Sequence, residues 1–513
     1  MKEDSHGKIL VKNTAFMYFR MFVLFIIYFY TSRVLLKELG VDDFGVFSLV
    51  GSVVAMFESL KVLFTSSTQR FLNYSLGEKN KERLSTVFNT SIYINLFIAL
   101  VFFICVEFVG LWFLNFKANI PADRMFAAQV VFQFSLVSTI LGIITTPYDA
   151  VIIANERMDV YAILSLIDGI LKLLIVLLLP LFATDKLIVY GILLFIVVLS
   201  IRVTTFVYCN KHFEECKLRK VYDKQIFRHM VIFAGWQFFG NSAFTVAQNG
   251  LNLILNIFGG TVLNAARGVA YQVRSAVNMF LNNITVVVNP YITKLRASNE
   301  KEKMFSTMFL SSKIMFTLDI LMVVPLLFLT QPIVRLWLGY IPDYSLVFIQ
   351  ILMINTLVGV LKQQLDLLFK AEGKLKYYQI ADSICLILPL IVSYYFLKFS
   401  NQYHYVFVFV VLFDVLGFVV CSLIAKRIVG LNLWEYFKNV VLPCFICSCF
   451  ILAVHRFCLN QSSLFIDNNL LLSCLVTLGV LTACLTFMYF VGLRKIERQQ
   501  ITQTITSFLR KKM

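Results

Sequence analysis

Long apolar runs constrain this chain more than any other feature of its sequence. Each run is long enough to cross about 30 Å of hydrocarbon as an α-helix. An apolar surface of this extent cannot be hidden in one water-soluble core, so the predicted fold is an all-α integral membrane protein. We count about fourteen such runs, at 13–36, 44–67, 86–112, 122–147, 161–180, 186–208, 229–257, 262–290, 305–330, 343–369, 379–397, 404–425, 439–454 and 469–492.

Charge supports a membrane location rather than a nucleic-acid partner. The 513 residues are 59% hydrophobic, and 46 Lys and Arg against 29 Asp and Glu give a formal charge of +17. In a soluble protein this excess would suggest nucleic acid. Here the basic residues gather in short loops between the apolar runs, as the positive-inside rule requires. We therefore expect a multi-pass protein of the cytoplasmic (inner) membrane, with both termini cytoplasmic and membrane lipids around it.

The eleven cysteines do not indicate a metal site. Cys444, Cys447 and Cys449 have a spacing that suggests metal ligands, but they lie in an apolar run without a nearby His. Thiolates in hydrocarbon without compensating charge are costly. We expect no metal and no cofactor, apart from H⁺ or Na⁺ as a coupling ion.

An internal duplication is visible at a period of about 220 residues. Segment 85–91 (STVFNTS) resembles 306–312 (STMFLSS), 154–161 (ANERMDVY) resembles 371–378 (AEGKLKYY), and Asp149 aligns with Asp366. Six spans therefore repeat as six, in an arrangement that secondary transporters use with the substrate between the halves. The predicted domains are six-helix bundles at 1–210 and 211–428, followed by two further helices and a basic tail at 429–513.

Two consecutive runs carry polar stripes, and neither stripe can face lipid. Residues at three- and four-residue steps share one helical face. Interhelical hydrogen bonding could explain Asn and Thr alone, but two arginines on one stripe favour a wet cavity. The stripes are Gln237, Asn241, Thr245, Gln248, Asn252 and Asn256 in the first run, and Asn264, Arg267, Tyr271, Arg274, Asn278, Asn282, Thr285 and Asn289 in the second.

Arginines without an acid on their own helix indicate an anionic ligand. A charge in the bilayer centre costs at least ~2.5 kcal/mol, and guanidinium suits phosphate oxygens better than ammonium does. Glu58 with Lys61, Lys172 with Asp168, and Lys362 with Asp366 have spacings at which each could neutralise the other. The candidate substrate-binding residues are Arg20, Lys61, Arg267, Arg274, Gln237, Asn241 and Asn278.

Four embedded acids are candidates for ion coupling: Glu58, Asp366, Asp382 and Asp414. A gradient-driven transporter needs a group that changes protonation or coordinates sodium between states. Asp366 ranks first because Asp149 is its repeat equivalent. Asp149 and Asp366 could equally be structural partners of nearby Lys or backbone groups.

Four segments carry a resemblance to a known family: ELGVDDFGVFSLVG (38–51), QRFLNYSLG (69–77) with Arg83 and Leu84, PYDAVIIANERM (147–158) and LNAARGVAYQ (263–272). The chain resembles the polysaccharide (O-antigen type) flippases of the multidrug/oligosaccharidyl-lipid/polysaccharide exporter superfamily over most of residues 13–425. The resemblance implies two six-helix bundles that alternate between inward-open and outward-open forms. It also implies transport of an undecaprenyl-diphosphate-linked oligosaccharide to the outer leaflet, for surface polysaccharides such as lipopolysaccharide.

The resemblance also implies cavity-facing arginines on the first, second and eighth helices. Arg20 and either Arg267 or Arg274 match by position, whereas the second helix offers Lys61 instead of arginine. Many drug exporters of the superfamily carry an Asp on the first helix, and this chain has none there. Other polysaccharide assembly proteins are conceivable partners.

Two other functions stay open. One is an ion-coupled multidrug or metabolite exporter of the same superfamily. The other is a membrane enzyme of glycan assembly, a polymerase or ligase, which the short loops and the lack of a catalytic motif disfavour. The sequence therefore favours a transporter over an enzyme.

The predicted topology can be tested with site-specific labels. A cysteine near Lys79 should be labelled from the cytoplasm, and one near Asn119 from the periplasm, because basic loops stay inside. Labelling with a membrane-impermeant thiol reagent in intact and permeabilised cells measures this. The reverse pattern would contradict the orientation.

Overall fold

The computed structural model describes residues 2–116, 120–219, 221–338, 341–460, 470–495 and 497–499. Within these ranges the chain is helical and has no β-strand, which confirms the all-α prediction. It divides into two compact units, 9–235 and 236–513, the second joined by residues 1–8. This division falls within α6, whereas the predicted boundary at 210/211 lies in the last turn of α5.

The N-terminal unit begins with the longest helix, α1, which is bent once at Gly40. The central helix α3 packs against α2 and α5, and α4 packs against α5. The elements are α1 (Lys2–Gly77), α2 (Lys81–Phe116), η1 (Ala122–Arg124), α3 (Met125–Ala154), α4 (Met158–Leu178), η2 (Leu179–Leu181), α5 (Lys186–His212) and η3 (Glu214–Cys216), followed by the start of α6 (Lys224–Ala297).

The C-terminal unit has the same packing plan. Its central helix α9 packs against α7 and α11, and α10 packs against α11. The elements are the remainder of α6, then α7 (Lys301–Phe328), α8 (Thr330–Leu338), α9 (Ser345–Glu372), α10 (Leu375–Leu397), α11 (Tyr405–Ile428), α12 (Leu433–Tyr436), η4 (Phe437–Val441), α13 (Leu442–Asn460), α15 (Leu470–Phe487) and η5 (Met488–Gly492).

Backbone geometry repeats at the predicted period. Gly40 (φ 77°) bends α1 and Gly260 (φ 67°) bends α6, and these two positions are 220 residues apart. Lys79 and Asn299, also 220 apart, both adopt positive φ in the turn that follows each bent helix. Since a left-handed residue is placed at the same point of both units, the two units are structural repeats.

Eleven helices of the described chain are long and apolar enough to cross a membrane. Each matches a predicted run, so the chain is multi-pass, but the count of about fourteen is not confirmed. The runs 44–67, 229–257 and 262–290 are helical yet lie outside the eleven. The two limbs of α6 (224–259 and 261–297) carry the polar stripes, which lower their hydropathy.

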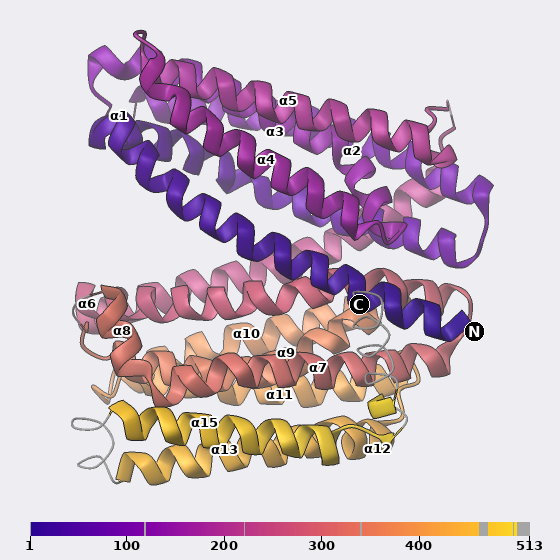
Figure 1. The fold of residues 1–513 in the computed structure, drawn as a ribbon, viewed down its shortest axis with the longest axis vertical. Helices are drawn as coiled ribbons and strands as arrows, with labels where there is room; N and C mark the ends of the chain where they lie inside the picture. Colours follow the sequence, from indigo (N-terminus) through magenta and orange to yellow (C-terminus); the bar gives the residue numbers. More distant parts are fainter. Residues whose placement is uncertain are drawn as a thin grey trace, which may run out of the picture. The chain divides into compact units, whose positions relative to one another are not determined.

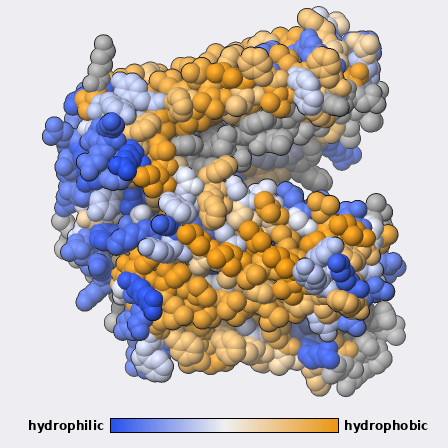
Figure 2. Space-filling view, turned by 180° about the vertical axis from the view of Figure 1, so that it is seen from behind, coloured by the Kyte–Doolittle hydropathy of each residue, from blue (hydrophilic) through white to orange (hydrophobic). Residues whose placement is uncertain are grey.

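The surface has the polarity of a membrane protein. In Figure 2, hydrophobic residues form a broad band along the helices of each unit, and hydrophilic residues gather at the helix ends. Many large apolar side chains are exposed, among them Phe97 and Phe108 on α2 and Leu412 on α11. A continuous apolar flank of this kind is stable only against lipid.

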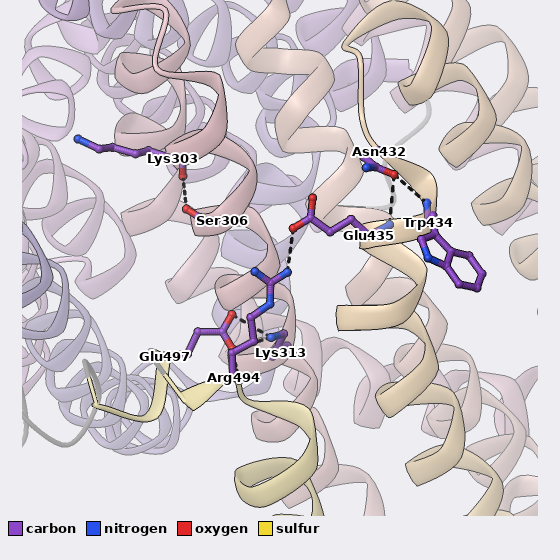
Figure 3. A network of polar contacts seen from close by, with 8 residues as sticks. All are labelled: Lys303, Ser306, Lys313, Asn432, Trp434, Glu435, Arg494 and Glu497. Carbon is purple, nitrogen blue, oxygen red and sulfur yellow. Dashed lines mark hydrogen bonds and ion pairs between the residues drawn. The ribbon is translucent and has the colours of Figure 1, made fainter.

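The two helices outside the repeat, α13 and α15, lie along one edge of the C-terminal unit beside α7 (Figure 1). Beyond η5, Glu497 accepts from Lys313 of α7 at 2.6 and 2.9 Å, and Arg494 pairs with Glu435 of α12 at 2.9 Å (Figure 3). The Lys313 side chain is completely buried. The chain after η5 is therefore fixed to the repeat by a buried ion pair.

The bend at Gly260 gives a test of the backbone argument. Gly260→Ala should lower the free energy of unfolding by about 1–2 kcal/mol and with it the melting temperature. An L-residue at positive φ is strained even where nothing crowds its Cβ. Gly268→Ala is the matched control, since Gly268 is helical and also has open space around its Cβ. Thermal unfolding in detergent measures both, and equal melting temperatures would refute a strained bend.

Candidate functional site

Arg267 joins the two limbs of α6. Its Nη2 donates to the backbone oxygen of Gln248 at 2.7 Å and to the Oε1 of the same residue at 3.2 Å. Its Nη1 donates to Oδ1 of Asn252 at 3.3 Å. The two predicted stripes therefore face each other here, and the glutamine and asparagine of one stripe hold the arginine of the other. Through these hydrogen bonds Arg267 positions the two limbs of α6 against each other.

Arg274 lies one step further along the same face. The Tyr271 ring lies between the two arginines, 4.1 Å from the Arg267 guanidinium carbon and 5.8 Å from that of Arg274. Cation–π contact keeps a guanidinium in place without using its N–H groups. The Nε of Arg274 is buried and has no hydrogen-bond partner among the described residues. Arg274 therefore keeps donors for a ligand.

The other predicted polar residues of α6 differ in exposure. Asn241 and Asn278 are exposed, whereas Gln237 is buried and only 6% exposed. Asn282 accepts from Gln363 of α9 at 2.7 Å. The structure thus leaves Asn241 and Asn278 accessible and encloses Gln237.

In the N-terminal unit, Arg20 lies on α1 with its guanidinium 4.9 Å from the ring centre of Tyr161 on α4. Its Nε is buried without a hydrogen-bond partner among the described residues. The predicted candidates Glu58 and Lys61 have side chains outside the described residues. Arg20 therefore resembles Arg274 in having an aromatic contact and an unused donor.

Lys362 is the centre of a buried ion cluster, and the predicted pairing of Lys362 with Asp366 is wrong. The Lys362 Nζ instead pairs with Asp382 of α10 and with Asp414 of α11, the latter at 3.1 Å. Asp414 also accepts from Asn355 Nδ2 at 2.7 Å. The long lysine side chain points away from Asp366 and reaches two neighbouring helices. Attraction to the two carboxylates there is stronger than attraction to the single carboxylate of Asp366, four residues along α9.

Asp366 pairs with Lys370, at 2.6 Å in the last turns of α9. Its repeat equivalent Asp149 pairs with Arg202 of α5 at 2.8 Å. The predicted pair of Lys172 with Asp168 is confirmed at 2.7 Å. Three of the four proposed coupling acids, Asp366, Asp382 and Asp414, therefore have a basic partner.

Asp319 is an acid that the sequence analysis did not select. It lies in the middle of α7 with 0% exposure, and its Oδ1 is 3.2 Å from Oγ1 of Thr356 on α9. One signal in the sequence could have found it: it is an acid inside an apolar run with no Lys or Arg three or four residues away. Thr356 follows Asn355, so adjacent residues of α9 contact Asp319 on one side and Asp414 on the other.

These groups form one polar line through the C-terminal unit. Arg274 lies within electrostatic range of Asp414, which connects the α6 arginines to the Lys362 cluster and, through Asn355 and Thr356, to Asp319. We define the polar line by its members Arg267, Tyr271, Arg274, Asp414, Lys362, Asp382, Asn355, Thr356 and Asp319. It holds three basic residues and three acids, and Lys362 pairs with two of the acids. The two arginines, which form no ion pair among the described residues, offer positive charge to a ligand.

The repeat shows that the fold does not need this line. The aligned segments 154–161 with 371–378, and 85–91 with 306–312, place Thr145, Ser165 and Ile98 of the N-terminal unit at the positions of Lys362, Asp382 and Asp319. The equivalent helices of the N-terminal unit pack in the same order, although these three positions hold neutral residues. Buried charges that a scaffold can omit are candidates for function.

Comparisons with known proteins agree on the fold. Residues 18–178 match the MatE family model. No curated protein matches the chain. A solved outward-facing multidrug resistance MATE family transporter of the MOP superfamily is similar with a TM-score of 0.71 and 13% identity, over 83% of this chain and 97% of that one.

Two further solved structures have a similar fold. A mutant MATE protein has a TM-score of 0.72 and 13% identity, over 83% of this chain and 96% of that one. A MOP superfamily transporter from Pyrococcus furiosus has a TM-score of 0.69 and 13% identity, over 82% and 95%. The latter is described as having a binding pocket of reverse polarity that suggests a different function. At these identities the likeness shows the fold alone.

The Lys362 cluster predicts a large loss of stability when its cation is removed. Lys362→Met leaves two buried carboxylates without a partner, which should cost about 3–5 kcal/mol. Lys172→Met is the matched control, because that i,i+4 pair is partly exposed and such pairs are worth about 0–1 kcal/mol. Thermal unfolding in detergent compares the two.

A triple variant tests the reason for that loss. Adding Asp382→Asn and Asp414→Asn to Lys362→Met should restore most of the melting temperature, since the repeat tolerates neutral residues at corresponding positions. A Lys362→Met protein as stable as Lys172→Met would show that the two carboxylates do not depend on this lysine.

Proposed function

We propose that this chain is a secondary transporter, a flippase, that moves an undecaprenyl-diphosphate-linked oligosaccharide from the inner to the outer leaflet. The observation that carries the proposal is the pair of arginines around Tyr271, of which Arg274 keeps unused donors inside an apolar helical protein. A diphosphate is the part of such a substrate that a guanidinium would bind. The sugar chain would serve surface polysaccharide synthesis, including lipopolysaccharide.

The geometry of α6 supports a site for an elongated anion. Arg267 and Arg274 are seven residues apart, which is about 10.5 Å along the helix and nearly the same face. In the proposal the exposed Asn241 and Asn278 line a wet cavity with them, and Arg20 and Lys61 remain predicted substrate-binding residues of the N-terminal unit. The lipid tail stays in the bilayer while the diphosphate passes along the basic groups.

The comparisons support transport as the class of function. The matched family segment and the similar structures belong to MATE and MOP transporters. The transporter described with reverse pocket polarity offers a precedent for a protein of this fold whose pocket suggests a different function. In this chain the two arginines of the polar line favour an anion over a cationic drug. Coupling to H⁺ or Na⁺ and a place in the inner membrane are part of the proposal.

An ion-coupled multidrug or metabolite exporter is the second candidate, because a similar structure is a multidrug resistance transporter. The two candidates differ in the charge of the cargo. Purified protein in liposomes should flip a lipid diphosphate sugar and should not accumulate a cationic dye. Dye accumulation without lipid transport would favour the exporter.

The role of Arg274 predicts graded loss of transport. Arg274→Ala should reduce flipping of the lipid diphosphate sugar at least 100-fold, because it removes both the charge and the fork of donors. Arg274→Lys should retain a measurable fraction, since it replaces bidentate contacts with a point charge. The initial rate of flipping in liposomes is the measurement.

Arg267→Ala is the comparison that separates binding from positioning. It should lower the melting temperature, since Arg267 ties the two limbs of α6, whereas Arg274→Ala should leave it unchanged. Full transport by a well-folded Arg274→Ala protein would refute the anion site.

A further inference from the structure

Asp319 is enclosed in the protein without a cation. Of the acidic side chains that the structure describes, it is the one with 0% exposure and no ion pair. Its Oδ1 has Thr356 as partner, and its Oδ2 is buried with no hydrogen bond. An ionised carboxylate left in this state costs many kcal/mol, so a buried acid of this kind binds a proton instead.

The hydrogen bonds of Thr356 support a neutral carboxyl group. Its hydroxyl is 2.7 Å from the carbonyl oxygen of Met353 and 3.2 Å from Oδ1 of Asp319. A hydroxyl has one proton to donate and can also accept. When that proton goes to the nearer carbonyl, the contact with Asp319 is a hydrogen bond only if the carboxyl group supplies its own proton.

No charged group on the neighbouring elements replaces that proton. Asp319 is on α7, which packs against α8, α9, α13, α15, η4 and η5. In the described parts of α15 and η5 there is no Asp, Glu, Lys or Arg. Charged or titratable groups on the other elements and on α7 itself include Lys313, Arg335, Lys362, Lys438 and His455.

Each of these five groups either interacts with another residue or lies far from Asp319 along the helices. Lys313 pairs with Glu497 and is about 9 Å away along the axis of α7. Lys362 pairs with Asp382 and Asp414, about 9 Å along α9 from Thr356. The His455 ring packs on Phe328 near the end of α7, Arg335 lies on α8 beyond that end, and Lys438 is exposed near the other end.

We propose that Asp319 is a proton-binding site of the transport cycle, and that its occupancy is linked to the packing of α7, α9 and α11. The part that concerns transport rests on the proposed function. The link is structural: Thr356 and Asn355 are adjacent on α9, and they contact Asp319 of α7 and Asp414 of α11. When Asp319 loses its proton to water, the new charge requires Lys362 to leave Asp414, or α7 to separate from α9 and admit water.

Packing alone does not explain the carboxyl group. The repeat places Ile98 at the same position of α2, where it is buried. An apolar side chain therefore fills this position in one unit and an acid in the other. The acid adds a titratable group to the junction that the fold does not require.

Infrared spectroscopy tests proton binding without reference to any cargo. At neutral pH the spectrum of the full chain minus that of Asp319→Asn should contain a band of a protonated carboxyl group. Asp168→Asn is the matched control, since Asp168 is paired with Lys172 and should be ionised. A difference spectrum for Asp319→Asn without that band would show that Asp319 is ionised and would overturn the proposal.

Transport in liposomes tests the link to the cycle. An imposed pH gradient should change the flipping rate of the unaltered protein and of Asp168→Asn several-fold, and that of Asp319→Asn by less than 1.5-fold. Equal melting temperatures would confirm that Asp319→Asn is folded. A full gradient response in Asp319→Asn would overturn the coupling role. Absence of lipid transport by the unaltered protein would count against the proposed function, and the infrared result would still decide proton binding.

Discussion

One lysine holds the polar interior of the C-terminal unit together. Lys362 on α9 neutralises Asp382 of α10 and Asp414 of α11, the next two helices along the chain. Two carboxylates in an apolar interior would otherwise repel each other and lose their hydration. Because this cation is shared, α9, α10 and α11 have one common electrostatic centre, and the other members of the polar line are arranged around it.

The duplication separates scaffold from function. Both units bend a long helix at a glycine of positive φ and pack their later helices in the same order. Only the C-terminal unit has lysine and aspartate at the positions where its repeat has Thr145, Ser165 and Ile98. Helix packing in either unit needs close apolar contact, which both sets of residues permit. The charges therefore add chemistry to a framework that is already stable.

Two kinds of charge are combined in the polar line. The arginines of α6 carry the positive charge that attracts an anion. Asp319 can change its charge, because its surroundings favour a proton over a cation. The packing of α7, α9 and α11 depends on the charge of Asp319, whereas the arginines of α6 keep their charge. This combination suits a protein that moves an anion with the energy of a proton gradient.

The sequence by itself determined the helices, the repeat and the i,i+4 pair of Lys172 with Asp168. These depend on hydropathy and on spacing along one helix, which are local properties. It also identified the arginine stripe of α6, since residues seven apart share a face. Only the tertiary structure decided that Lys362 pairs with Asp382 and Asp414, that Arg267 binds Gln248, and that Asp319 is enclosed without a cation. Long side chains reach several neighbouring helices, and which helix lies within reach is fixed by packing between segments that are far apart in the chain.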